Sequence, residues 1–477
     1  MQVTEAEQLK RAFASSLAEK AEQIPEILSL NQTKSLAFLV PHLEEVAKYG
    51  IADLSDDDLI WPFVGLSRTY EAQGLYSLAE PWRQKCFDVA SDRFGELNIH
   101  VAVSSGNLAS LYFLLGDYSK AEPLISQVVQ YWKHSVGEQH PVFATSLNNL
   151  ASIYENQGRY DEAETLFSQA LKLRKCILSE NHPDIAISLN NLANLYSSQQ
   201  RYDKAEPLLV EALKRFRLVF ENEHPHVAMS LENLAIVYKG QGRYSKAESL
   251  FLQALDLRER LLGAEHPNVD LSLSNLAALY ETQKRYDETE PLLLRSLDLN
   301  RSILGKKHPN VAISLNNLAK LYKNQGYFDE AEFLYAEALE IRKCSLGDTH
   351  PDVAISLNNL AGLYAEQKRY REAESLYLQA LNIKKQVFGD LHPAVAKSLN
   401  NLAQLYADQE YYDKAEPVFR QALKIFEAHF GGNHPDTVMI YKNLKGLRFK
   451  IVEKVNKQRK RKVKMRSNGR GFGNKQE

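Results

Sequence analysis

Apolar side chains recur along most of this chain at helical spacing, in stripes separated by short polar stretches. Leu357, Leu360 and Tyr364, for example, fall at positions i, i+3 and i+7, which lie on one face of an α-helix. The polar residues 367–370 interrupt this stripe, and a second apolar stripe follows over residues 373–381. The pattern therefore predicts two amphipathic helices joined by a tight turn.

The same two-helix pattern returns at a fixed interval. His-Pro dipeptides begin at residues 140, 182, 224, 266, 308, 350, 392 and 434, and every interval is 42 residues. Two earlier units, from residues 56 and 98, lack the His-Pro but keep other positions of the pattern in frame. A period of about 20–50 residues is typical of stacked repeats. We therefore predict nine 42-residue repeats over residues 56–433.

Local signals mark the ends of the predicted helices. Pro351 suits the first turn of a helix, where a backbone N–H is not needed. The spacings Asp203-x-x-Glu206 and Ser245-x-x-Glu248 have the form of a capping box at the start of the second helix. A glycine such as Gly389 follows that helix in most units, as a helix C-terminus favours. Since no segment shows the alternation of a β-strand, the chain is predicted to be all-α.

The order of apolar residues in each unit resembles the tetratricopeptide repeat, as in Leu147, Leu150, Ala151, Tyr154, Ala163, Phe167 and Ala170. The 42-residue length and the joining sequence Leu-Gly-x-x-His-Pro-x-Val-Ala are similar to the kinesin light chain subgroup. Residues 59–82 are similar to the segment that precedes the repeats in bacterial members of this subgroup. The resemblance implies a right-handed α-solenoid, a superhelix of stacked antiparallel helix pairs.

Kinesin light chains bind their motor through a long N-terminal coiled coil. Here 55 residues precede the repeats, and they do not sustain the three or four heptads of a coiled coil. The resemblance is therefore to the bacterial type that lacks this coiled coil.

The ends of a stacked array need polar caps. We expect residues 1–55 to form an N-terminal helical cap or a degenerate repeat, and residues 434–455 to form a C-terminal capping helix. Residues 456–477 are basic and poor in apolar side chains, so this tail is expected to be disordered.

One asparagine recurs in every unit from residue 98 onward, although its neighbour does not. On a helical wheel of about 100° per residue, Asn359 falls almost opposite the apolar stripe. The resemblance implies that this face lines the inside of the superhelix. A carboxamide both donates and accepts, so a row of them can pair with the backbone of an extended peptide. The predicted peptide-binding residues of this row are Asn107, Asn149, Asn191, Asn233, Asn275, Asn317, Asn359 and Asn401.

Two lysines of the same face, Lys320 and Lys323, join the predicted groove residues, and with Lys239 they suggest a basic mid-section. Acidic residues such as Glu281 interrupt it, so no ligand charge follows. The alternative for the asparagine row is structural: each amide would bond a neighbouring helix and meet no ligand.

No catalytic or metal-binding pattern stands out from the repeat. Zinc needs ligands about 2 Å from the ion, all converging on one point. Histidines one repeat apart should be two helix widths apart, each about 8–10 Å, so we assign them to repeat junctions. The sequence therefore predicts no enzyme, no metal, no cofactor and no small-molecule substrate.

Charge is distributed unevenly. Residues 442–477 carry 14 Lys and Arg against two acidic residues, a net +12, while the rest of the chain carries 44 basic and 58 acidic residues, a net −14. The opening residues have no apolar core of a signal peptide, and no run reaches the roughly 18 apolar residues of a membrane span. These features predict a soluble, cytoplasmic protein.

Together these observations predict a non-enzymatic scaffold that binds extended peptide segments of other proteins in a concave groove. One alternative is an adaptor tethered to nucleic acid or an anionic membrane through the basic tail 456–477. Another, implied by the resemblance, is a kinesin light chain-type cargo adaptor with a cytoskeletal link.

Overall fold

The structure is a computed structural model that describes residues 4–25, 32, 35–95, 97–432 and 434–469. It divides into two compact units, residues 1–363 and 364–477, each of which is described by itself. Every regular element in the described part of the chain is helical. The predicted all-α solenoid of stacked helix pairs is confirmed.

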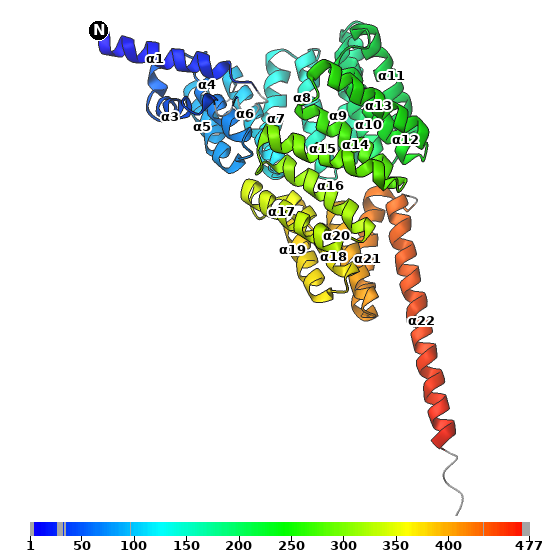
Figure 1. Cartoon of the computed structure of the whole chain (residues 1–477). Coiled ribbons are helices and arrows are strands. Elements are labelled where there is room, and N and C mark those ends of the chain that lie inside the picture. The colour runs from blue at the N-terminus through cyan, green and yellow to red at the C-terminus, as the bar shows by residue number, and fades with distance from the viewer. Residues whose placement is uncertain (1–3, 26–31, 33–34, 96, 433, 470–477) are drawn as a thin grey trace, which may run out of the picture. The chain divides into compact units, whose positions relative to one another are not determined.

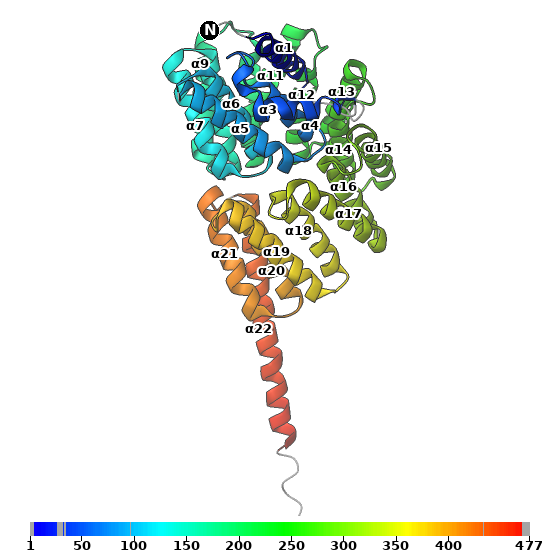
Figure 2. The same ribbon diagram turned by 90° about the vertical axis from the view of Figure 1, so that its left-hand side faces the viewer.

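Three helical elements precede the repeats: α1 (Glu5–Glu22), α3 (Val40–Tyr49) and the short 3-10 helix η1 (Ile51–Asp53). Each repeat then contributes a first helix, here called helix A, and a second, helix B. These pairs are α4 (Trp61–Glu71) and α5 (Tyr76–Phe94), α6 (Ile99–Leu114) and α7 (Tyr118–Ser135), α8 (Pro141–Asn156) and α9 (Tyr160–Ile177), α10 (Pro183–Ser198) and α11 (Tyr202–Phe220), α12 (Pro225–Gly240) and α13 (Tyr244–Leu262), α14 (Pro267–Thr282) and α15 (Tyr286–Leu304), α16 (Pro309–Gln325) and α17 (Phe328–Leu346), α18 (Pro351–Glu366) and α19 (Tyr370–Phe388), and α20 (Pro393–Asp408) and α21 (Tyr412–Phe430). Within each unit, helices consecutive in the chain pack side by side (Figures 1 and 2).

The predicted apolar stripes form the core. Leu357 and Leu360 of α18 are 2% and 5% exposed, and Ala361 is fully buried. Helix B contributes small residues such as Ala163 of α9, together with large ones such as Phe167. One apolar cluster runs through α8 to α13, so neighbouring repeats share a continuous core. Such an array is stabilised by contacts between adjacent repeats.

The repeated histidine is the N-cap of helix A. From α8 to α22, its Nδ1 accepts a hydrogen bond from the backbone N–H two residues later, at 3.0–3.3 Å. In α6, Asn98 fills the same role at 2.8 Å. Each cap satisfies one of the backbone N–H groups that a helix start leaves unpaired. The histidines therefore serve the repeat junctions.

The predicted capping boxes of helix B are wrong. Helix α11 begins at Tyr202, with Arg201 as an N-cap residue that makes no side-chain cap bond. Asp203 therefore lies inside the helix, and Glu206, its fifth residue, is too far along to reach back to the cap. Glu206 instead accepts hydrogen bonds from Arg243 at 2.8 Å and from Gln241 at 3.0 Å, both in the next repeat.

The glutamate of helix B links adjacent repeats in other units too. Glu248 accepts hydrogen bonds from the hydroxyl of Tyr280 at 3.0 Å and from Nη1 of Arg285 at 3.0 Å. The Arg285 guanidinium also lies 3.9 Å from the centroid of the Tyr280 ring. Charge-assisted and cation–π contacts thus fix this A–B turn on the preceding repeat.

The last helix, α22 (Pro435–Gly469), is longer than we predicted. It begins as the expected closing helix, with Lys442, Lys445 and Lys450 exposed. It then continues through the first part of the basic tail that we expected to be disordered, because residues 456–466 contain no glycine or proline to end it. Residues 470–477 of the predicted tail lie outside the described residues. None of the described helices combines the length and apolar character that a membrane span requires.

Candidate functional site

Five A helices carry two consecutive asparagines, and the two have different environments. The first of the pair is buried in three repeats, where Asn148, Asn190 and Asn316 are 4%, 1% and 6% exposed; Asn358 and Asn400 are half-buried. Asn190 donates through Nδ2 to the hydroxyl of Ser230 in the next repeat at 2.9 Å. Asn148 and Asn316 make the same bond to their own next repeats at 3.4 and 3.3 Å. In these three repeats the first asparagine therefore joins repeats and is not available to a ligand.

A buried arginine of helix B completes the same junction in several repeats. Arg342 of α17 donates to the hydroxyl of Ser356 at 2.8 Å and to the backbone oxygen of Asp352 at 3.0 Å. In the junction after α13, Glu232 replaces the asparagine and pairs with Arg258. The glutamate at position 232, where other repeats have asparagine, thus forms an ion pair with the buried arginine of the junction.

The second asparagine, which we predicted to bind peptide, lies on a more accessible face. Asn149 and Asn401 are exposed, while Asn107, Asn191, Asn233, Asn275, Asn317 and Asn359 are half-buried. The residue four positions earlier, on the same helical face, is mostly apolar and partly exposed; examples are Val103 at 38%, Leu271 at 51%, Ile313 at 42% and Ile355 at 43%. The row therefore runs beside a line of accessible apolar side chains.

The amides of this row do not all have the same partners. Asn359 donates through Nδ2 to Oδ1 of Asn316 in the preceding repeat, at 3.2 Å. Asn443 makes the equivalent bond to Asn400 at 3.2 Å. In contrast, Nδ2 of Asn233 is buried and has no hydrogen-bond partner among the described residues. Some amides of this asparagine row therefore bond a neighbouring repeat, and Nδ2 of Asn233 has no partner among the described residues.

One of the two predicted lysines, Lys320, lies beside an acidic residue. Lys320, whose side chain is 57% exposed, pairs with Glu281 at 3.0 Å, and Asn324 donates to the same carboxylate at 2.8 Å. Lys323 is half-buried on the same helix, α16. Burial, and then repulsion from Lys320, lower the pKa of Lys239 on α12. The structure therefore brings Lys239, Glu281 and Lys320 into one charged cluster.

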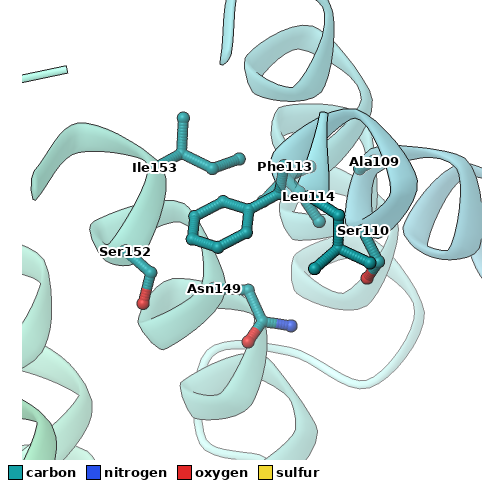
Figure 3. A pocket seen from close by; sticks show the side chains of 8 residues that line it. Ala109, Ser110, Phe113, Leu114, Asn149, Ser152 and Ile153 are labelled. Carbon is teal, nitrogen blue, oxygen red and sulfur yellow. The ribbon is translucent and has the colours of Figure 1, made fainter. Parts of the chain in front are cut away.

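Asn149 lines a cavity of about 380 Å³ between α6 and α8 (Figure 3). The cavity wall is mostly apolar, with hydroxyl and amide groups at its edge: its lining residues are Ala109, Ser110, Phe113, Leu114, Ile125, Asn149, Ser152 and Ile153. The ring of Phe113 points toward α8, where Ile153 and Asn149 lie (Figure 3). An apolar cavity with a few polar groups is the usual form of a binding site for a small group or side chain.

We did not predict this cavity from the sequence. Phe113 and Leu114 stand where the next repeat has Glu155 and Asn156, so one divergent repeat presents two large apolar side chains on the accessible face. This departure from the repeat pattern is the sequence feature from which the cavity could have been predicted. Among the described residues, no group of three or more His, Cys, Asp or Glu is placed to hold a metal ion.

The tetratricopeptide repeat pattern matches residues 142–217, 184–260, 226–288, 268–343, 352–428 and 394–449, and a second form of it matches 107–175 and 316–387. No curated protein matches the chain.

Three solved structures illustrate the similarity. The kinesin light chain-type, nearly identical TPR-like repeats of Podosopora anserina are 27% identical, with a TM-score of 0.37, covering 43% of this chain and 97% of theirs. BtubC (BKLC) from P. vanneervenii is 27% identical, with a TM-score of 0.40, covering 50% and 94%. A Rap protein complexed with competence and sporulation factor is 15% identical, with a TM-score of 0.51, covering 80% and 98%, which shows the fold alone.

Arrays of this repeat serve as protein-interaction scaffolds and are generally non-catalytic. The matched residues span more than half of the chain, in register with the 42-residue period. The chain therefore belongs to the tetratricopeptide repeat family.

Proposed function

We propose that the protein holds an extended peptide segment of a partner along the accessible face of its A helices. The cavity between α6 and α8 takes one apolar side chain of that peptide, and the asparagine row pairs with its backbone. The observation that carries the proposal is the apolar cavity with the exposed amide of Asn149 at its edge.

The cavity suits a large apolar side chain. Its volume of about 380 Å³ exceeds what a single methyl group would fill, and Phe113, Leu114 and Ile153 offer apolar contact. Burying a Leu or Phe side chain contributes roughly 1.5–3 kcal/mol. Such a side chain therefore supplies an anchor that the amide row by itself lacks.

The amide row supplies the backbone contacts. Each carboxamide offers one acceptor and two N–H donors, which suit the C=O and N–H groups of an extended chain. The exposed amide of Asn149 is the member of the row beside the cavity that is most available for this pairing. Asn359 is less available because it already bonds Asn316.

The experiment is a selection from a random peptide library on the immobilised full chain, followed by affinity measurement for the enriched peptides. Ser110→Trp should block the cavity from its edge and weaken binding at least tenfold. Ser168→Trp, an equally large change on the exposed surface of α9, is the matched control and should bind like wild type. Equal binding by both variants would place the peptide elsewhere.

A second candidate function rests on α22. Its continuation beyond residue 455 carries the basic segment as one helix rather than a loose chain. A helix with this charge would attach the array to nucleic acid or to an anionic membrane. A kinesin light chain-type cargo adaptor would be a special case of the peptide-binding scaffold.

A further inference from the structure

Two turns near the start of the first unit contact the beginnings of A helices far along the chain. A Cβ atom placed on Gly74 would lie 2.5 Å from Cδ of Pro309, and one on Gly116 would lie 2.7 Å from Cγ of Pro351. Both pairs are separated by 235 residues (309 minus 74, and 351 minus 116). The same contact thus occurs twice in register, where the array returns upon itself within this unit. We call the two contacts the clasp.

A histidine hydrogen bond belongs to the second of these contacts. Nδ1 of His350 accepts from the backbone N–H of Asp352 at 3.0 Å, so the neutral ring carries its proton on Nε2. Nε2 lies 2.9 Å from the backbone oxygen of Leu114 and donates to it. Leu114 is the last residue of α6, where carbonyl groups lack partners within the helix. His350 therefore satisfies the end of a helix that is 236 residues away.

The histidines and tyrosines of the clasp are largely buried. His308 and His350 are each 7% exposed. Tyr76 and Tyr118, the first residues of α5 and α7, have their pKa raised to about 12 by burial, and the negative charge of Asp352 contributes in both. The α4–α5 turn thus packs against the start of α16, and the α6–α7 turn packs against the start of α18.

Leu114 connects the clasp to the cavity between α6 and α8. Its backbone oxygen is held by His350, while its side chain lines that cavity (Figure 3). The same residue lines a second cavity, of about 450 Å³, between the α4–α5 turn and the starts of α14 and α16. The position of the end of α6 therefore sets the shape of the proposed anchor site.

We propose that the clasp regulates the proposed peptide site: when closed, it fixes the end of α6 and so holds Phe113 and Leu114 in place to receive an apolar side chain. His350 acts as a positioning residue through Leu114. Opening of the clasp releases the end of α6 and weakens binding of the anchor. This inference rests on the proposed peptide-binding function.

Two variants open the clasp by different means. His350→Asn keeps an N-cap, as Asn98 does in α6, but its side chain is too short to reach Leu114. Its matched control is His182→Asn, which makes the same change in α10. Gly116→Ala places a methyl group against Pro351. Its control is Gly242→Ala, in a turn of similar φ (75° against 68°) with nothing within 4 Å of the added Cβ.

Hydrogen exchange followed by mass spectrometry measures, without any ligand, how firmly the clasp holds the end of α6. The amides of Leu115, Gly116 and Asp117 bond to carbonyls of α6, so they report on its end. We expect faster exchange over residues 111–117 in His350→Asn and Gly116→Ala than in the two controls. Unchanged exchange in both clasp variants would overturn the proposal.

The affinity for a library-selected peptide then shows whether the clasp affects binding in the cavity between α6 and α8. We expect His350→Asn to weaken the peptide about fivefold, the effect of one hydrogen bond, and to have no effect on the same peptide with its apolar anchor replaced by Ala. Faster exchange with unchanged affinity would mean that the clasp exists but does not regulate the site. If wild type selects no peptide, the proposed function fails and this regulation fails with it, while the exchange result still decides whether the clasp forms.

Discussion

Glu232 of α12 and Arg258 of α13 form an ion pair of 2.6 Å in which the side chains are only 3% and 6% exposed. Arg258 also donates to the hydroxyl of Ser272 and to the backbone oxygen of Asn268 in the next repeat, both at 2.9 Å. A buried charge is tolerated only when it is paired and hydrogen-bonded. The pair therefore locks the junction between α12, α13 and α14.

Removal of one partner should be costly. Glu232→Ala leaves the Arg258 charge buried and unpaired, so we expect a loss of about 3–5 kcal/mol in the free energy of unfolding of this region. Glu232→Asn should cost less, because Asn148 and Asn316 occupy the same position beside Arg174 and Arg342. Urea unfolding followed by circular dichroism measures the difference.

The exposed pair Glu223–Arg260, 2.8 Å long, is the control for this prediction. Its side chains are 51% and 52% exposed, so Glu223→Ala should cost about 0–1 kcal/mol. Similar losses in Glu223→Ala and Glu232→Ala would mean that burial does not decide the strength of the junction.

The imidazole caps should make stability depend on pH. Burial lowers the pKa of His308 from 6.5 to about 4 and lowers that of His350 as well. A histidine with a depressed pKa is neutral in the fold, and protonation removes the Nδ1 acceptor that caps the helix. This stability is fully present above pH 6.5 and is lost as the pH falls toward about 4. We expect the melting temperature to fall across that window.

His308→Asn tests the cause of this pH dependence. Asparagine caps a helix without titrating, so the variant should lose less stability than wild type between pH 6.5 and pH 4. Thermal melts at several pH values give the comparison. An identical pH profile in the variant would assign the effect to other groups, such as the many carboxylates.

The helix pairs of the fold could be predicted from the sequence because the same apolar stripes and helix-end signals recur in successive repeats. The stripe of Leu357, Leu360 and Ala361 and the helix end at Gly389 recur with a period that only stacked helix pairs explain. The capping boxes predicted at Glu206 and Glu248 were wrong. A glutamate three residues after an Asp or Ser has the same sequence spacing whether it bonds the cap of its own helix or a residue of the next repeat. Only the start of the helix at Tyr202 distinguishes these cases.

The site was less accessible to prediction. A helical wheel separates Asn359 from the apolar stripe of its helix. It could not show that Asn316 forms a hydrogen bond with Ser356 of the next repeat. The bond between His350 and Leu114 depends on how far the superhelix turns per repeat, which is a sum of small packing angles. No local pattern encodes that sum.

The basic part of α22 should bind polyanions through charge. If it does, binding of full-length protein to heparin or to anionic vesicles should weaken steeply with salt. Replacement of Arg459, Lys460, Arg461 and Lys462 by Gln should abolish it while the helix is kept. Val463→Pro, which breaks the helix but keeps every charge, is the matched variant. Binding that is insensitive to salt would remove the tethered-adaptor function.

Neighbouring asparagines of α16 offer the sharpest test of the groove. Asn317→Ala changes the half-buried amide of the predicted row, so melting should be nearly unchanged and binding of a selected peptide should fall by about 0.5–1.5 kcal/mol. Asn316→Ala removes the buried bond to Ser356 and should cost about 1–3 kcal/mol of stability. Leu315→Ala, at a fully buried core position, should cost about 2–5 kcal/mol.

Asn275→Ala should behave like Asn317→Ala, whereas Asn359→Ala should fall between the two groups because its amide bonds Asn316. Paired measurements of melting temperature and peptide affinity on all five variants separate the roles. The groove interpretation requires that affinity and stability change in different variants, since one amide of each pair faces a ligand and the other faces a junction. If Asn275→Ala and Asn317→Ala melt early and bind normally once folded, the second asparagine is also structural, and the peptide must be held by the α6–α8 cavity without the amide row.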